Sequence, residues 1–150
     1  MKKQLITLSL AVLVTISSAF AGNKEGVSDK AIKSFNREFA QARNVEWDTN
    51  KELQKATFEL NGQVMFAYYN KEGELLAVSR NLATNQLPIR LSASLKQQYG
   101  DYWVSDLFEM ASNNESSYYI TVENADSKTV LRAIGAGDWQ LYKKIKKEAL

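Results

Sequence analysis

Four oxygen-bearing side chains in "DTNKELQKATFE" have the spacing of a calcium-binding loop. Asp48, Asn50, Glu52 and Glu59 occupy positions one, three, five and twelve of an EF-hand pattern. Position six, where the sharp turn requires glycine, is Leu53, and the end of the stretch alternates like a strand instead of entering a helix. The pattern therefore does not predict calcium, and we expect no metal and no other cofactor.

The chain contains no histidine and no cysteine. Nucleophilic catalysis by a Ser–His or Cys–His pair is therefore excluded, and zinc and copper sites lose their preferred ligands. Two catalytic alternatives remain: a carboxylate pair for glycoside hydrolysis, and a Ser–Lys arrangement that no flanking signature supports. The carboxylates available for such a pair are Glu46, Asp48, Glu52 and Glu59. We predict that the protein is not an enzyme and assign no catalytic residue.

Two pairs of adjacent tyrosines, Tyr68-Tyr69 and Tyr118-Tyr119, lie in strand-like stretches. Successive side chains of a strand point to opposite faces of its sheet. One ring of each pair should therefore join the core with Phe58 and Phe66, and its neighbour should stand on the open face.

Outward rings on neighbouring strands would form an amphipathic patch of the kind that interfaces favour. We predict a binding surface made of Tyr69, Tyr119 and Tyr142, with Trp139 as the alternative if the strand phase is reversed. Cross-strand aromatic pairing that only stabilises the sheet is the competing interpretation.

The elements that position these rings begin with an amphipathic helix over residues 27–42. Ser28 is its expected N-cap, and Ile32, Phe35 and Phe39 form an apolar stripe. A short strand at 45–47 follows. The stretch "ATFELNGQVMFAYYNKEGELLAVSR" then predicts a three-stranded meander, with turns at "NG", the strongest short hairpin signal, and at "NKEG".

The second half repeats this order of elements. After a connector containing Pro88, a helix is expected over 92–99, followed by strands in "DYWVSDLFEMA", "SYYITVEN", "KTVLRAIG" and "DWQLYKKIKK". We predict an internal duplication, with repeats at 27–82 and 90–147. The expected fold class is α+β: two tandem helix-plus-antiparallel-meander repeats that form one sheet, with the helices packed on one face.

The N-terminal segment reads as a signal peptide, residues 1–21. Lys2 and Lys3 precede an apolar run, and Ala19-Phe20-Ala21 has the small-x-small pattern of a cleavage site. The run is too short to span a bilayer, so we expect no membrane insertion of the mature chain. The mature protein would be a single domain, residues 22–150, in the periplasm or secreted.

Cleavage changes the charge balance. Removing Lys2 and Lys3 from 19 basic residues leaves 17, equal to the 17 acidic residues, so no attraction to nucleic acid is expected. Local charge remains in "LYKKIKKEAL", where the lysines are 143, 144, 146 and 147. These lysines either touch phosphate-rich envelope surfaces or form a solvated strand edge.

The segments "FNREFAQARNVEWD", "ATFELNGQVMFAYYNKEGELL" and "DWQLYKK", together with the signal peptide, carry a resemblance. The chain resembles the PepSY-like, β-lactamase-inhibitor-like (BLIP-like) family of small exported bacterial envelope proteins. The resemblance implies a continuous antiparallel sheet with helices on one side. Most of that family has no defined function, so no catalytic residue is carried over.

Three functional hypotheses follow. The first is a non-catalytic exported module that binds a protein, a peptide or an envelope polymer through the aromatic sheet face. The alternative is a structural or stress-response component that self-associates through an exposed edge strand such as "SYYITVEN". A hydrolase using carboxylates or Ser–Lys is ranked last.

Overall fold

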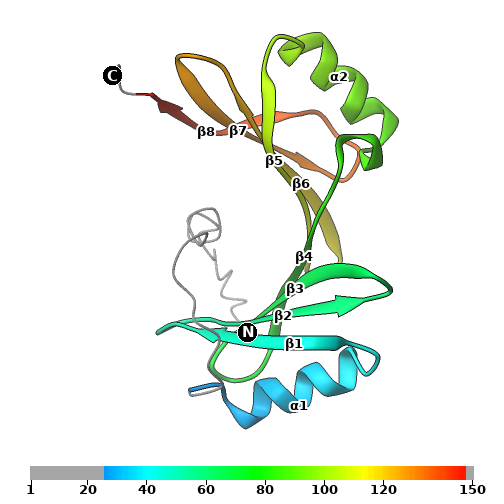
Figure 1. Cartoon of the computed structure of the whole chain (residues 1–150), viewed down its shortest axis with the longest axis vertical. Coiled ribbons are helices and arrows are strands. Elements are labelled where there is room, and N and C mark those ends of the chain that lie inside the picture. The colour runs from blue at the N-terminus through cyan, green and yellow to red at the C-terminus, as the bar shows by residue number, and fades with distance from the viewer. Residues whose placement is uncertain (1–25, 148–150) are drawn as a thin grey trace, which may run out of the picture.

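The computed structural model describes residues 26–147, so the expected signal peptide and its cleavage site lie outside the described residues. Eight strands form one antiparallel sheet in chain order, β1 to β8, with two α-helices (Figure 1). The elements are α1 (Asp29–Glu38), β1 (Arg43–Thr49), β2 (Gln54–Leu60), β3 (Gln63–Tyr69), β4 (Leu75–Asn81), α2 (Ile89–Tyr99), β5 (Trp103–Ser112), β6 (Glu115–Glu123), β7 (Ser127–Ile134) and β8 (Gln140–Lys146).

Both helices pack on the same face of the sheet. The sheet bends into an arch, and α1 and α2 lie on its outer side (Figure 1). The α1 core includes residues of β1 to β3, whereas the α2 core includes residues of β5 to β7. Each half thus consists of a helix followed by four strands. The internal duplication stays a prediction, because a shared order of elements does not by itself establish a repeat.

Helix α1 begins as expected and ends early. The Ser28 hydroxyl accepts a hydrogen bond from the Ala31 N–H at 3.2 Å, which caps the first turn. The helix stops at Glu38, four residues before the predicted end. Phe39 leaves helical geometry at φ −123° and ψ 50°, while its N–H still donates to the Phe35 carbonyl at 2.8 Å.

The core under α1 combines large rings with small residues. Phe35 contacts Trp47 and Phe58, with ring centroids 5.5 and 5.0 Å away. Alanines of α1, β2 and β3 are fully buried in the same core: Ala31, Ala56 and Ala67. Small side chains on facing surfaces let a helix lie close to a sheet, so these alanines fix the face of β2 and β3 that α1 covers.

The turns follow the local sequence signals. Asn61 and Gly62 have φ angles of 53° and 77°, which confirms the expected hairpin with two positive φ values. The β3–β4 loop, the second expected turn, packs against α1. In this loop Gly73 has a φ of 81° and lies beside the backbone of Lys30. Gln54 secures the same corner, because its side-chain amide donates to the Asn70 carbonyl at 2.7 Å.

The second half differs from expectation in its boundaries. Helix α2 begins at Ile89, directly after Pro88, three residues before the expected start. Leu91 and Leu95 anchor it on the sheet, and the Trp139 Nε1–H donates to the Leu91 carbonyl at 3.0 Å. The stretch "DYWVSDLFEMA" forms the single ten-residue strand β5. Since β5 pairs with β4, it joins the two halves into one continuous sheet.

The strand in "SYYITVEN" is not an edge, which corrects the route proposed for self-association. It is β6, and it pairs along its length with both β5 and β7. Its backbone groups are therefore used inside the sheet. The edge strands are β1 and β8. Any pairing of this sheet with a further strand would have to use one of them.

Candidate functional site

The sheet face opposite the two helices carries a second cluster of aromatic residues. We call it the open face, because neither helix covers it in the part of the chain that the structure describes. It is the inner side of the arch (Figure 1). Strand register places its residues in rows across the sheet. One row is Phe66–Ser79–Met110–Ser117, and the next includes Phe108–Tyr119–Arg132.

Four aromatic rings form the centre of the open face. Phe108 stacks on Tyr119 with centroids 5.0 Å apart and ring planes at 11°. Tyr142 meets Tyr119 edge-on at 5.6 Å and 88°. Tyr68 packs against the same cluster, beside the buried Ala77. We call Tyr68, Phe108, Tyr119 and Tyr142 the aromatic centre. It brings β3, β5, β6 and β8 together on one surface.

A second strip of the open face lies on β2 and β3. The Lys55 ammonium stands 5.8 Å from the centroid of the Phe66 ring and forms an ion pair with Asp48 at 3.3 Å. Val64, two residues before Phe66 on the same face, is 53% exposed. Apolar side chains therefore continue from the aromatic centre toward the β1 side of the sheet, with a paired charge beside them.

The four sequence-predicted binding residues do not share one surface. Tyr119 and Tyr142 lie on the open face, where Tyr119 is buried and Tyr142 is half-buried. The outward orientation expected of Tyr69 is wrong: it is 0% exposed and packs with Trp47 in the α1 core, 5.8 Å between centroids. Trp139 is buried in the α2 core. Tyr68, the neighbour of Tyr69, is the tyrosine of that pair on the open face.

Tyr69→Phe should leave the free energy of unfolding unchanged or raise it by about 1 kcal/mol. The Tyr69 hydroxyl is buried without a hydrogen-bond partner, and burial raises the pKa of Tyr69 far above its usual range. Removing an unsatisfied hydroxyl removes a desolvation cost. Chemical denaturation of the variant and the wild type measures the difference, and a clear loss of stability would contradict the burial argument.

The aromatic centre contains polar groups without partners. The Tyr119 hydroxyl and the Arg132 Nε–H are buried, and neither makes a hydrogen bond of good geometry to the described residues, although the Arg132 guanidinium is close enough to Tyr119 to act on its pKa. One terminal nitrogen of Arg132 donates to the Ser117 hydroxyl at 3.1 Å and lies 3.7 Å from Glu115. Burial raises the pKa of Tyr119, so its hydroxyl remains a neutral donor at neutral pH. Because both atoms are buried, the centre presents ring surface, and not these two donors, to its surroundings.

One end of the open face is held by Glu123. Its carboxylate accepts from Lys147 at 2.9 Å and pairs with Lys128 at 3.2 Å. Hydrogen bonds from the Ser105 hydroxyl and from Lys147 lower the pKa of Glu123 from 4.5 to about 2. Lys147 also stands 4.5 Å from the ring centroid of Trp103. These interactions, which we call the Glu123 corner, link β5, β6 and β7 to the residue that follows β8.

Acid should weaken this corner in a defined pH window. Because the folded pKa of Glu123 lies below 4.5, its stabilisation is complete above about pH 4.5 and is lost as the pH falls toward 2. We expect Glu123→Gln to reduce the fall in melting temperature across this window. Glu52→Gln, in the exposed β1–β2 turn, is the control and should keep the wild-type slope. Identical slopes for all three proteins would contradict the role of Glu123.

The acidic residues considered for calcium binding or catalysis do not form one cluster, and two of them make separate local contacts. Asp48 pairs with Lys55, and Glu59 accepts from the Asn44 side chain at 3.1 Å. Asn50 closes the β1–β2 turn by accepting from the backbone N–H of Glu52 at 2.8 Å. The end of the calcium-like stretch lies in β2. Within residues 26–147, no group of three or more acidic side chains is placed to bind a metal ion.

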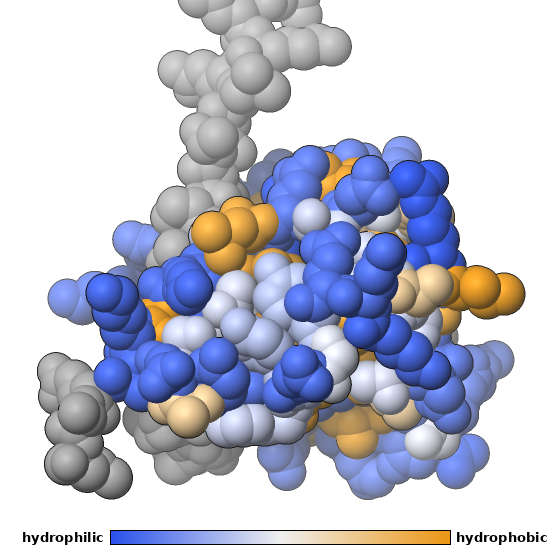
Figure 2. All heavy atoms as spheres, turned by 90° about the horizontal axis from the view of Figure 1, so that it is seen from above, coloured by the Kyte–Doolittle hydropathy of each residue, from blue (hydrophilic) through white to orange (hydrophobic). Residues whose placement is uncertain are grey.

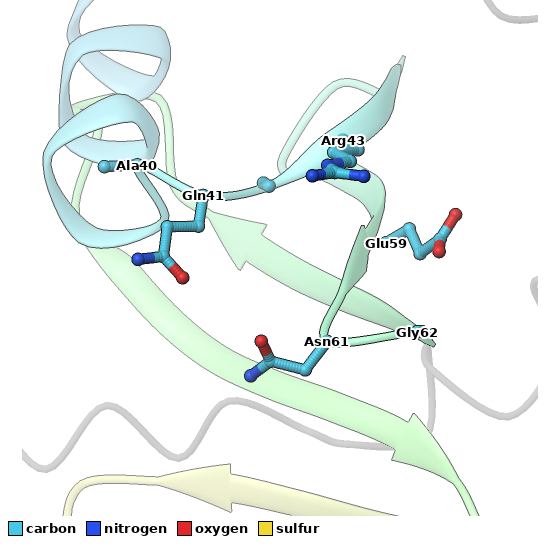
Figure 3. Close-up of a pocket in the computed structure, with 7 residues that line it drawn as sticks. Ala40, Gln41, Arg43, Glu59, Asn61 and Gly62 are labelled. Atoms are coloured by element: carbon cyan, nitrogen blue, oxygen red, sulfur yellow. The ribbon is translucent and has the colours of Figure 1, made fainter.

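Two hollows lie outside the aromatic centre. The first, about 490 Å³, lies where the chain passes from α1 to β1, beside the β2–β3 turn. Its lining is mainly polar, and the Gln41 and Asn61 side chains lie on two sides of it (Figure 3). The second, about 310 Å³, lies between α2 and β5, with Tyr99 and Tyr102 in its wall. Seen from above, most of the surface is hydrophilic, with separate hydrophobic patches (Figure 2).

Comparison with solved structures identifies the fold. A BLIP-like protein from Bacteroides fragilis is 18% identical, with a TM-score of 0.69 over 79% of this chain and 85% of that one. A DUF2874 family protein from Bacteroides ovatus is 19% identical, with a TM-score of 0.70 over 79% and 86% of the two chains. The fold is BLIP-like. At these identities the likeness shows the fold alone.

A third similar solved structure comes from Bacteroides eggerthii, and its provisional name describes a periplasmic protein. It is 13% identical, with a TM-score of 0.70 over 80% of this chain and 88% of that one. No protein-family model and no curated protein matches the sequence. The PepSY part of the expected resemblance therefore stays a prediction. No helix among the described residues is long and apolar enough to cross a membrane.

Proposed function

We propose that this protein is a non-catalytic, exported binding module that holds a protein partner against its open face. The observation that supports this proposal best is the aromatic centre. An antiparallel sheet with both helices on one side needs only that side for its core. Here the other side also carries Tyr68, Phe108, Tyr119 and Tyr142 on four strands. Large aromatic side chains are enriched where proteins bind one another.

The shape of the surface supports the same proposal. The arch presents the open face as its inner side, which a convex partner could enter (Figure 1). The partly exposed rings of Phe66, Tyr68 and Tyr142 would contact the partner and exclude water from the interface. The name of the Bacteroides fragilis structure, BLIP-like, refers to an inhibitor, and inhibitors of enzymes act by binding. A peptide or an envelope polymer would meet the same surface.

Differential capture from an envelope extract tests this proposal. The bait is the tagged chain from residue 22, the expected first mature residue, and captured proteins are quantified by mass spectrometry. We expect the double variant Phe66→Ala/Tyr142→Ala, which removes one partly exposed ring from the second strip and one from the aromatic centre, to retain less than a tenth of the partner that the wild type captures. Aromatic contacts in an interface can each contribute about 1–2 kcal/mol or more. Ile89→Ala is the control, because Ile89 is 89% exposed on α2, on the other side of the sheet.

If the double variant loses capture and also has a much lower melting temperature, aromatic pairing that only stabilises the sheet would be favoured. Unchanged capture by the double variant would contradict an open-face site. Loss of capture with little change in melting temperature is the result that the proposal predicts. The self-associating alternative makes a different prediction, namely oligomers of the chain alone, and sedimentation at high micromolar concentration detects them.

A further inference from the structure

Strand β8 is an edge strand whose outer backbone groups have no strand beside them in the described part of the chain. The Lys147 N–H donates inward to the Asp126 carbonyl at 2.9 Å. Hydrogen-bonding direction alternates along an antiparallel strand. The register Ser127↔Lys146 and Thr129↔Lys144 therefore directs the N–H and C=O groups of Lys146 and Lys144 away from β7. These groups form a free hydrogen-bonding edge.

The side chains along this edge combine charge with exposed apolar surface. Leu141 and Ile145 are 64% and 42% exposed. The lysines of β8 alternate between the two faces, so that Lys143 lies on the open face and Lys144 and Lys146 lie on the other. None of these three lysines has an ion pair with a described residue, whereas Lys147, just beyond the strand, is paired with Glu123. Among residues 26–147, the edge therefore carries positive charge on both faces with no acidic side chain paired to it.

The same charge opposes pairing of β8 with a second copy of itself. An antiparallel β8–β8 pair that uses the outward groups of Lys144 and Lys146 places a lysine opposite a lysine in each such register. Like charges directly opposite each other destabilise a strand pair, and lysines on edges protect proteins from edge-to-edge aggregation. A strand bearing acidic side chains would instead be attracted to the lysines of β8 on both faces of the sheet.

We propose that the β8 edge binds an extended acidic polypeptide segment as a ninth strand. The partner's backbone would bond the outward groups of Lys144 and Lys146, its acidic side chains would pair with the three lysines, and its apolar side chains would cover Leu141 and Ile145. Strand addition of this kind draws affinity from main-chain hydrogen bonds and specificity from side chains. A lipid phosphate would satisfy the lysines but could not match alternating N–H and C=O groups. This site is separate from the open-face proposal and does not depend on it.

The test uses a ten-residue synthetic peptide in which Glu-Glu pairs alternate with Val-Val pairs, so that each face of the added strand carries both residue types. It is added to the isotope-labelled chain from residue 22. We expect saturable binding, with slowed amide hydrogen exchange at Lys144 and Lys146. A peptide with proline in place of alternate valines keeps the charge but loses backbone donors, and it should bind at least tenfold more weakly. A lysine–valine peptide should not bind.

Matched variants of the protein complete the test. Lys143→Glu/Lys144→Glu/Lys146→Glu should weaken binding of the glutamate–valine peptide at least tenfold. Lys30→Glu/Lys33→Glu/Lys51→Glu makes the same charge change on exposed lysines of α1 and the β1–β2 turn, and it should bind like the wild type. Phe66→Ala should also bind normally, which separates this site from the open face.

Three results would overturn the proposal. The first is equal binding of the proline-containing peptide, which would mean attraction by charge alone. The second is protection of amides elsewhere than at the outward positions of β8. The third is binding of the chain to vesicles of anionic phospholipid, or to itself, in preference to the peptide, since a different occupant would then use the edge.

Discussion

Gly73→Ala is expected to lower the free energy of unfolding by about 2–4 kcal/mol, because two costs act together. Gly73 has a φ of 81°, a conformation that disfavours side chains. A Cβ at this position would also lie 2.6 Å from the backbone carbonyl carbon of Lys30 and 2.8 Å from the Ala31 nitrogen. These are main-chain atoms at the start of α1 and cannot rotate away, so either the β3–β4 loop or the helix must move.

Gly62→Ala provides a matched control for this prediction. Gly62 has nearly the same φ, 77°, but a Cβ there would meet nothing within 4 Å. We expect a loss of about 1 kcal/mol, which is the conformational cost alone. Chemical denaturation of both variants separates the two contributions. Equal losses would show that the β3–β4 loop does not press on α1 in solution, and the packing of that corner would be wrong.

Phe58→Ala should cost about 3–5 kcal/mol of stability, the usual range for a buried phenylalanine. Phe58 is 1% exposed and contacts Phe35 and Phe39, at centroid distances of 5.0 and 4.8 Å. Phe66 lies on the neighbouring strand but on the opposite face, where it is half-buried. We expect Phe66→Ala to cost about 1 kcal/mol, since a partly exposed ring loses less buried area.

The comparison of these two phenylalanines is informative because the residue type and the strand environment are matched. Thermal unfolding of both variants is the measurement. A loss at Phe66 as large as that at Phe58 would mean that a second hydrophobic core occupies the open face. The rings of the open face would then be structural, and the proposed function would lose its main support.

Local sequence signals predicted much of the fold. Ser28 caps α1 as expected, Asn61-Gly62 forms the predicted turn, and the order of helices and strands agrees with the structure. These features depend on residues that are close in sequence, so a single chain is enough to infer them. The end of α1 and the start of α2 were missed, because helix ends depend on tertiary contacts as well as on propensity.

The phase of β3 could not be predicted in the same way. Aromatic residues occupy both faces of this strand, so hydrophobicity does not distinguish Phe66 and Tyr68 from Tyr69. The buried alanines decide the phase: Ala67 faces α1 together with Ala56. The sequence does contain a hint of the phase, because Ala67 lies between two large rings, Phe66 and Tyr68. This hint predicts the phase only if one knows that α1 packs closely on the face with the small residues.

The hydrogen bonds and ion pairs of the open face also could not be predicted from local sequence patterns. Arg132 reaches the Ser117 hydroxyl across the β6–β7 pair, and Glu123 collects donors from β5, β7 and the end of β8. Such contacts depend on strand register over separations of several to more than twenty residues. The interior position of β6 has the same cause, because only the complete strand order identifies β1 and β8 as the edges.

The central claim is that a partner docks on the open face, and protection of single cysteines tests it most directly. The chain has no cysteine, so Val64→Cys on the open face and Ile89→Cys on α2 each introduce one exposed thiol. Their reaction rates with a maleimide are measured with and without the captured partner. The account predicts at least tenfold slower labelling at residue 64 and an unchanged rate at residue 89 when the partner is bound. Protection at residue 89 with free labelling at residue 64 would contradict it.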